Sequence, residues 1–236
     1  MSDEGIRINK YLAECGVCSR RGADELIAKG FVTVDGEPAE NGMRIMPGMK
    51  VAVKGRVISD IDEKVYLAFN KPRGVVCTAK KDDERNVIGF LNYPVRVTYC
   101  GRLDKDSEGL LIMTNDGDLI DAMMRSRNGH EKEYIVTVNK TVTDAFMFQM
   151  SKGVYLEELN VTTKKCTVKR ISDNSFSIIL TQGLNRQIRR MCEAFGYRVR
   201  KLIRIRVMNI ELKDLQTGKY RELTEAELKD LKKLTL

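Results

Sequence analysis

The sequence has few of the residues that build metal centres. It contains one histidine, His130, and six cysteines, of which only Cys15 and Cys18 form a C-x-x-C pair. A structural zinc site needs about four ligands, usually from two such pairs or from one pair plus histidines. A thioredoxin-like pair should follow a strand and open a helix, whereas helical sequence flanks this pair on both sides. We therefore predict no metal, no cofactor and no redox role. The two cysteines are interpreted as small buried residues, and His130 as a surface or loop residue.

Long hydrophobic runs are also missing. No stretch of about 18 apolar residues is present, so no transmembrane helix is expected. The first ten residues, MSDEGIRINK, lack the apolar core and the cleavage pattern of a signal peptide. We therefore expect a cytoplasmic protein without a membrane partner. Hydrophobic residues make up 42% of the 236 residues, which is typical of a globular chain that folds as one domain or as a small domain plus a larger one.

Acidic residues are scarce in one part of the chain. The formal net charge of +8 favours a polyanionic partner. Residues 185–206, NRQIRRMCEAFGYRVRKLIRIR, hold eight basic side chains against the single acid Glu193. A solvated helix face usually mixes the two signs of charge. We therefore interpret residues 185–206, called the basic tract below, as a surface that contacts phosphate.

Three carboxylates alternate in DKDSEG at 104–109, which resembles the start of a calcium loop. Such a loop needs Asp or Asn at its fifth position and a bidentate acid at its twelfth, where this chain has Glu108 and Asn115. The intervening LLIMT is apolar and predicts a buried strand. These departures argue against calcium and leave open covalent chemistry by one of the acids.

Helix and turn signals predict a compact unit over residues 1–58. Amphipathic helices are expected at 6–16 and 20–30, with Ser19 as the N-cap of the second helix. Asp35-Gly36 predicts a hairpin, and a further short strand follows a Pro-Gly turn at 47–48. The polar, acidic stretch SDIDEK at 59–64 is interpreted as a linker.

Residues 65–236 are predicted to form a larger second domain. Strands are expected at 95–100, 109–114, 133–139, 165–170 and 175–181, and helices at 117–126, 143–152, 185–196 and 224–233. Asn185 is a candidate N-cap for the third of these helices, and Thr224 with Glu227 forms a capping box for the fourth. Strands outnumber helices without regular alternation, which favours an α+β fold over a doubly wound sheet.

Residues 7–36, RINKYLAECGVCSRRGADELIAKGFVTVDG, resemble the S4 RNA-binding module, in which a helical pair and a hairpin dock on structured RNA. The alternative is an ordinary basic helix pair. The resemblance implies RNA contacts from Arg7, Lys10, Ser19, Arg20, Arg21 and Lys29.

Four further blocks occur in order. They are FNKPRGVVCT at 69–78, GRLDKDSEGLLIMTNDGDL at 101–119, KEYIVTV at 132–138 and GLNRQIRRMCEAFGYRV at 183–199. Together they resemble the RsuA-like branch of the pseudouridine synthases that modify ribosomal RNA, and the last block looks most like the RluF subgroup. The resemblance implies an S4 module followed by a catalytic domain with a mixed, mainly antiparallel sheet flanked by helices. It also implies isomerisation of a specific uridine without cofactor or metal.

The same resemblance implies roles for individual residues. Asp104 would be the essential carboxylate, which attacks the ribose C1′ or the uracil ring, or assists through a glycal. An ionised carboxylate in a mostly apolar pocket is opposed by desolvation, and Arg189 would offset that opposition as its ion-pair partner. Tyr134 would abut the uracil and assist proton transfer from its carbon 5, and Ile188 would form an apolar floor for the base.

The target uridine must be flipped out of folded RNA to reach Asp104. Arg102 would stand beside the flipped nucleotide, because arginine pairs bidentately with phosphate. Further RNA contacts are implied for Leu103, Lys105, Lys132, Arg186, Gln187, Ile188 and Arg190. Asp106, Ser107 and Glu108 are interpreted as turn and hydrogen-bonding residues.

Several alternatives stay open at the level of sequence. Large-subunit ribosomal RNA is the expected target, and a transfer RNA anticodon arm or small-subunit ribosomal RNA are the other substrates. A non-catalytic RNA-binding or ribosome-assembly factor would share the S4 module and the basic tract but would not need Asp104, Tyr134 and Arg189 together. A monomer is the expected oligomeric state.

Overall fold

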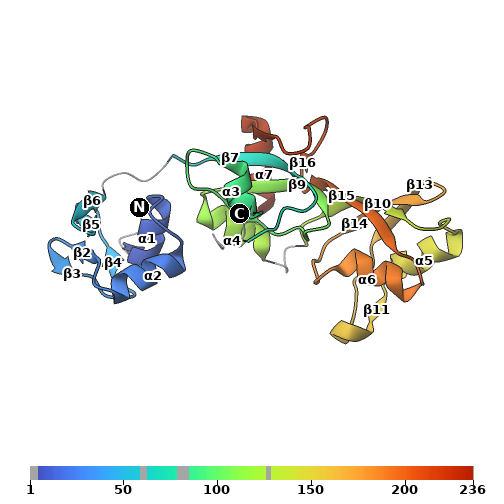
Figure 1. Ribbon diagram of the computed structural model, residues 1–236, viewed down its shortest axis with the longest axis horizontal. Helices are drawn as coiled ribbons and strands as arrows, with labels where there is room; N and C mark the ends of the chain where they lie inside the picture. Colours follow the sequence, from blue (N-terminus) through green and yellow to red (C-terminus); the bar gives the residue numbers. More distant parts are fainter. Residues whose placement is uncertain (1–4, 59–62, 79–84, 126–128, 236) are drawn as a thin grey trace. The chain divides into compact units, whose positions relative to one another are not determined.

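The structure, a computed structural model, describes residues 5–58, 63–78, 85–125 and 129–235 (Figure 1). The chain divides into two compact units. The first comprises Met1–Val65, Pro94–Arg96 and Asn115–Gly117, and the second comprises Tyr66–Tyr93, Val97–Thr114 and Asp118–Leu236. Residues 59–62 of the predicted linker lie outside the described residues. The boundaries of the linker and of the two domains remain predictions.

The first unit is built on two helices, α1 (Ile8–Glu14) and α2 (Arg20–Ala28). The Ser19 hydroxyl accepts a hydrogen bond from the Gly22 amide, 3.0 Å away, which confirms the predicted N-cap. Apolar residues of both helices, Ile8, Leu12 and Ile27 among them, pack against small strands. These strands are β1 (Ile6–Arg7) paired with β4 (Arg44–Ile45), and a sheet of β2 (Val32–Val34), β3 (Glu37–Pro38), β5 (Val51–Val53) and β6 (Arg56–Ile58).

A nine-stranded sheet forms the framework of the second unit. Its central path runs β13-β14-β10-β15-β9-β7-β17, with β8 paired to β9 and β16 paired to β15. Only the β9–β15 pairing is parallel among the strands described, so the predicted mixed, mainly antiparallel α+β sheet is confirmed. The strands are β7 (Tyr66–Lys71), β8 (Thr98–Cys100), β9 (Glu108–Thr114), β10 (Lys132–Val138), β13 (Thr167–Ser172), β14 (Ser175–Leu180), β15 (Val199–Val207), β16 (Ile210–Glu211) and β17 (Tyr220–Glu222).

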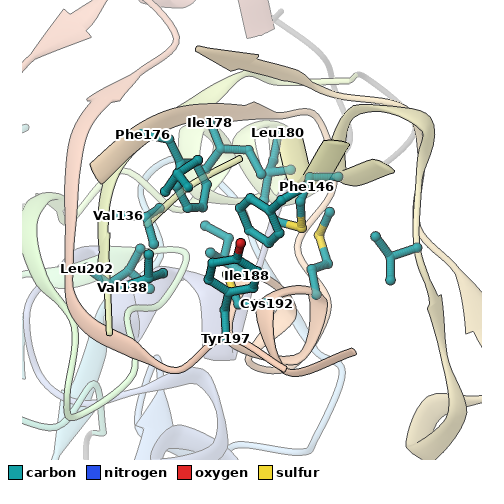
Figure 2. Close-up of a cluster of buried hydrophobic side chains, with 14 of the residues drawn as sticks. Val136, Val138, Phe146, Phe176, Ile178, Leu180, Ile188, Cys192, Tyr197 and Leu202 are labelled. Atoms are coloured by element: carbon teal, nitrogen blue, oxygen red, sulfur yellow. The ribbon is translucent and has the colours of Figure 1, made fainter. Parts of the chain in front are cut away.

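Helices flank this sheet (Figure 1). They are α3 (Val87–Leu91), α4 (Gly117–Met124), α5 (Asp144–Lys152), α6 (Gln187–Ala194) and α7 (Glu225–Thr235), and a small pair of strands, β11 (Tyr155–Leu156) and β12 (Val161–Thr162), follows α5. Figure 2 shows the core between α5, α6 and the strands, where Phe146 and Tyr197 lie beside Phe176 and Ile178. A second core joins α4 and α7 to β7, β9 and β15.

The central strand β15 was not predicted, because its residues fall within the basic tract. Its side chains alternate, with Ile203 and Ile205 packed against the core that contains α4 and α7, whereas Leu202 belongs to the core beside α6. Arg204 shares the Leu202 side of the strand and is 2% exposed. The alternation of side chains that is typical of a strand is therefore present within a run of positively charged residues.

Two local predictions for α6 and α7 have opposite outcomes. Asn185 does not cap α6, because the N-cap is Arg186, which makes no side-chain cap hydrogen bond. The capping box of α7 is confirmed, since the Thr224 amide donates to Glu227 Oε2 (3.0 Å) and the Glu227 amide donates to Thr224 Oγ1 (3.2 Å).

Two further expectations concern burial. His130 is buried rather than on the surface, and its Nε2 lies 3.2 Å from the carbonyl oxygen of Ala122. Its imidazole therefore packs in the interior, where that carbonyl provides a polar partner. Cys15 and Cys18 are free thiols that are only partly buried.

Candidate active site

Asp104 lies on the loop that connects β8 to β9. The loop turns sharply where the Ser107 amide donates to the Asp104 carbonyl oxygen at 3.0 Å. Leu103 is buried, and its amide lies 3.4 Å from the buried Cys77 thiol, which anchors the residue before Asp104. The Asp104 side chain is 31% exposed, so its carboxylate is more open to water than the predicted apolar pocket implies.

Arg189 on α6 reaches this loop. Its Nε lies 4.0 Å from Asp104 Oδ2, and its side chain is 9% exposed. Its Nη2 donates to the carbonyl oxygen of Asp106 (3.0 Å) and to the hydroxyl of Ser107 (3.3 Å). Burial and the neighbouring Arg186 lower the pKa of Arg189, and Asp104 raises it. The structure thus brings Asp104 and Arg189 together, with Ser107 as a second partner of the guanidinium.

Tyr134 enters the site through the strand register. It stands opposite Arg204 in the β10–β15 pairing, and Arg204 stands opposite Gly109 in the parallel β15–β9 pairing. The three residues therefore form a row across adjacent strands, which are about 4.8 Å apart. Gly109 is five positions after Asp104, so the row connects Tyr134 on β10, through Arg204 on β15, to the strand β9 that follows the Asp104 loop.

Arg204 holds both ends of the Asp104 loop and was not predicted as a site residue. Its Nε donates to the Leu110 carbonyl oxygen at 2.7 Å, and its Nη1 lies 3.5 Å from the Arg102 carbonyl oxygen. Gly109 has φ +105°, and an added Cβ would lie 2.3 Å from the Arg204 carbonyl oxygen. Only glycine fits at this approach of two backbones. An arginine at an inward position of a strand pattern is the signal that could have revealed it.

Lys71, at the end of β7, is a second buried cation that sequence reasoning missed. Its Nζ donates to the carbonyl oxygens of Pro72 (2.9 Å) and Val75 (2.8 Å), and it has no exposed surface. Burial lowers its pKa, whereas Cys77 and Asp104 raise it. The lysine therefore stabilises the Lys-Pro-Arg-Gly turn beside the Asp104 loop.

Two of the predicted RNA contacts, Gln187 and Leu103, lie in the interior. Gln187 is buried, and its side chain accepts a hydrogen bond from the Leu184 amide at 3.0 Å. That hydrogen bond satisfies an amide in the turn that leads into α6. Leu103 packs into the interior with 6% exposure. Ile188 also lies in the core around Phe146, and only 4% of its surface is open to a base.

Other predicted RNA contacts divide by exposure. Arg7, Arg20, Arg21, Lys29, Arg102, Lys105 and Arg186 are exposed. Lys10 approaches Glu14 at 3.9 Å, Arg190 pairs with Glu158, and the Ser19 hydroxyl is engaged as a helix cap. Lys132 is partly buried and donates to the His130 carbonyl oxygen at 3.1 Å, and burial lowers its pKa. The roles of these residues in RNA binding stay predictions.

Neither a metal cluster nor a membrane span appears in the described part of the chain. Those residues contain no group of three or more His, Cys, Asp or Glu side chains able to hold a metal ion. None of their helices is long and apolar enough to cross a membrane.

Comparisons with known proteins agree with this geometry. Residues 65–194 match the RNA pseudouridylate synthase family, and residues 6–51 match the S4 domain. The chain belongs to the RNA pseudouridine synthase family, whose members isomerise uridine to pseudouridine in RNA, and it carries an S4 domain in front of the catalytic domain.

Individual relatives share most of this chain. The dual-specificity RNA pseudouridine synthase RluF of Escherichia coli is 48% identical over 236 residues, which cover 99% of this chain and 81% of that protein. The ribosomal large subunit pseudouridine synthase B of Bacillus subtilis is 36% identical over 235 residues, covering 97% and 96%. A crystal structure of a pseudouridylate synthase matches with a TM-score of 0.70 at 28% identity, covering 96% of this chain and all of that one.

Proposed function

We propose that this pseudouridine synthase isomerises a uridine of large-subunit ribosomal RNA, with Asp104 as its essential carboxylate. The observation that carries the proposal is the approach of Arg189 Nε to Asp104 Oδ2 on a loop held by Arg204. Support for the target comes from the Bacillus subtilis relative, whose name specifies the ribosomal large subunit. The protein is proposed to act as a cytoplasmic monomer, and the S4 unit to contribute RNA affinity.

Asp104 begins the reaction as an anion. Its carboxylate is partly exposed, and the Arg189 guanidinium places a positive charge 4.0 Å away. Attack at the ribose C1′ or the uracil ring, or assistance through a glycal, requires that anion in each case. The bond from ribose to the uracil nitrogen breaks, the base rotates, and a bond to carbon 5 replaces it. The proton on carbon 5 leaves and the freed nitrogen gains one, so substrate and product are isomers.

Tyr134 is proposed to abut the flipped uracil and assist the loss of the proton from carbon 5. Its place in the row with Arg204 and Gly109 supports this role, because the row ends beside the Asp104 loop. Arg102 is proposed to stand beside the flipped nucleotide, since its side chain is exposed on that loop. Flipping supplies the access that a stacked uridine lacks.

Transfer RNA is a second candidate substrate. The observation that favours it is the 48% identity to an Escherichia coli enzyme that is named as dual-specificity. Both candidates use the same catalytic residues and differ only in which folded RNA presents its uridine.

The test is to incubate the full-length protein separately with unmodified large-subunit, small-subunit and transfer RNA. Pseudouridine is then mapped by carbodiimide modification and primer extension. We expect a new pseudouridine in large-subunit RNA that is absent when the protein is omitted. A modification confined to transfer or small-subunit RNA would replace the proposed target. A map of the pseudouridines lost when the gene is deleted fixes the nucleotide in the cell.

A further inference from the structure

The basic tract does not form one continuous basic surface. Arg189 and Arg204 are buried against the catalytic loop. Arg190 pairs with Glu158, and Arg206 pairs with Glu131 and Glu133. Four of the eight basic residues remain. Lys201 is exposed outside any such contact, and the other three, Arg186, Arg198 and Arg200, gather in one place.

These three arginines line a single cavity of about 500 Å³ between α6 and the start of β15. The remaining lining residues are Arg189, Glu193 and Val199. Arg186, Arg198 and Arg200 are exposed, and within the described residues none has a carboxylate at ion-pair distance. The cavity therefore holds four guanidinium groups against the single carboxylate of Glu193.

Such an accumulation of like charge is unfavourable without an anion. The effect is visible at Arg189, whose pKa is lowered by burial and by the neighbouring Arg186. Arg189 is 7% exposed, and its Nε is buried without a hydrogen-bond partner. Arg186 also has φ +51°, a left-handed conformation that costs about 1 kcal/mol or more for a side-chain-bearing residue. The N-terminus of α6 adds its own positive potential.

We propose that this cavity binds the RNA backbone phosphates next to the target uridine, an inference that rests on the proposed function and deepens it. Guanidinium groups pair with phosphate oxygens through two parallel hydrogen bonds. Arg189 lines the cavity and also reaches Asp104 at 4.0 Å, so a phosphate held there lies within one arginine side chain of the catalytic carboxylate. The proposal adds Arg198 and Arg200 to the RNA contacts, and it makes Glu193 a residue that weakens them.

The test measures binding of the full-length protein to an unmodified large-subunit RNA fragment that contains the target uridine. Fluorescence anisotropy gives Kd over a range of salt concentrations for the wild type, Arg198→Gln, Arg200→Gln and the double variant. We expect each single change to raise Kd about tenfold. Each lost phosphate contact should also make the plot of log K against log salt shallower by about 0.7–0.9. Glu193→Gln should lower Kd.

Two comparisons make the result specific. Arg170→Gln removes an arginine of β13 that pairs with Asp144, and it should leave Kd and the salt slope near wild type. Lys201→Gln removes an exposed charge next to Arg200 on the strand but outside the cavity, and its effect should be smaller than that of Arg200→Gln. Equal losses from Lys201→Gln and Arg200→Gln would overturn the cavity as the site. Unchanged Kd and slope in the double variant would overturn it as well.

Pseudouridine formation by each protein separates the two proposals. If the wild type modifies the fragment and the double variant binds it normally, the cavity is not the phosphate site, and the proposed function still stands. A wild type that makes no pseudouridine in large-subunit RNA contradicts the proposed function itself. Thermal unfolding of each variant is measured alongside, because these exposed arginines should be removable without loss of the fold.

Discussion

Arg189 is fixed more closely to the Asp104 loop than to the Asp104 carboxylate. Its Nη2 makes hydrogen bonds to the Asp106 carbonyl and the Ser107 hydroxyl at 3.0 and 3.3 Å, whereas its Nε is 4.0 Å from Asp104. The guanidinium therefore supplies positive potential without consuming the lone pairs of the carboxylate. An anion held in this way stays available to a substrate that enters from the exposed side.

The first prediction concerns this carboxylate. Asp104→Asn should lower the rate of pseudouridine formation by at least about 10³-fold, because an amide is not a nucleophile. RNA affinity should stay within about twofold of wild type, since the amide keeps the shape of the side chain. Single-turnover kinetics with excess enzyme and a binding titration give the two quantities separately.

Asp106→Asn is the matched control. Asp106 is an exposed acid two positions away, and it is its carbonyl oxygen rather than its carboxylate that holds Arg189. This variant should keep most of the activity. A wild-type rate for Asp104→Asn would remove that residue from the mechanism, and an equal loss for both variants would mean that charge on the loop matters more than position.

The sequence allowed the choice of Asp104 and Arg189 but not of the residues that hold them. Their motifs are local and resemble those of a family in which a carboxylate is paired with a guanidinium. Arg204 and Lys71 donate hydrogen bonds to backbone carbonyls of the Asp104 loop and of the Lys-Pro-Arg-Gly turn. Every residue has a backbone carbonyl, so such contacts produce no recognisable spacing in the sequence. The burial of Gln187 and Leu103 was not foreseen, because a polar or central motif position does not reveal whether a side chain faces inward.

Among the secondary-structure elements, the parallel strands β9 and β15 approach so closely that they restrict which residue can occupy position 109. Gly109 should not tolerate a side chain, since its φ of +105° is unfavourable for other residues and an added Cβ would meet the Arg204 backbone at 2.3 Å. Gly109→Ala should lower the free energy of unfolding by about 2–4 kcal/mol. Urea denaturation followed by circular dichroism measures the change.

Gly183→Ala is the control for this measurement. Gly183 does not have a positive φ, and an added Cβ would meet nothing within 4 Å. Its free energy of unfolding should stay within about 1 kcal/mol of wild type. Equal stabilities for the two variants would show that β9 and β15 do not approach as described.

The start of α7 gives a prediction that depends on pH. Glu227 accepts hydrogen bonds from Arg221 at 2.7 and 2.8 Å and also closes the capping box with Thr224. The hydrogen bonds from Arg221, together with the Thr224 amide, lower the pKa of the Glu227 carboxyl below its ordinary value of 4.5, against the opposing effect of burial. Its contribution to stability is therefore complete above pH 4.5 and is lost as the pH falls through the lower, folded-state pKa.

Glu227→Gln should accordingly reduce the free energy of unfolding by about 1–3 kcal/mol at pH 7. The difference from wild type should shrink as the pH falls below 4.5, because the protonated glutamate loses the same charge-assisted hydrogen bonds. Urea titrations at several pH values between 7 and 3 measure it. A difference that grows toward low pH would contradict the depressed pKa.

Elements with short-range signals were predictable from the sequence, whereas those defined by distant partners were not. Ser19 and the Thr224–Glu227 box cap their helices as predicted, and LLIMT forms most of β9, because each depends on neighbours within a few positions. The strand β15 is stabilised by β9 and β10, and nothing near it in the chain marks it as central. Asn185 failed as a cap since Arg186, in a left-handed conformation, occupies that position.

For the whole molecule, the two compact units imply a division of labour. The first unit has its own core and presents Arg7, Arg21 and Lys29 as exposed cations. We predict that the triple variant Arg7→Ala, Arg21→Ala, Lys29→Ala raises Kd for the RNA at least about tenfold. The salt slope should fall by about two to three, as expected for three lost phosphate contacts. The single-turnover rate at saturating RNA should remain near wild type, because Asp104 and Arg189 belong to the second unit.

The same kinetic experiment can also contradict this prediction. If saturating RNA does not restore the rate of the triple variant, the first unit takes part in the chemical step or in base flipping. If Kd does not change, these three cations do not contact the RNA backbone, and the S4 resemblance does not carry over to them.

The position of β15 in the sheet has a consequence for how the enzyme is made. β15 lies between β9 and β10 (Figure 1), although both precede it in the chain. Its Arg204 donates to the Leu110 carbonyl oxygen across 94 residues. A nascent chain that has just completed β10 therefore has Asp104 without Arg189 and exposes two strand edges that await the same partner. Unpaired edges of this kind invite intermolecular pairing. Activity should thus appear only after β15 has emerged, and the chain should be most prone to intermolecular pairing before then.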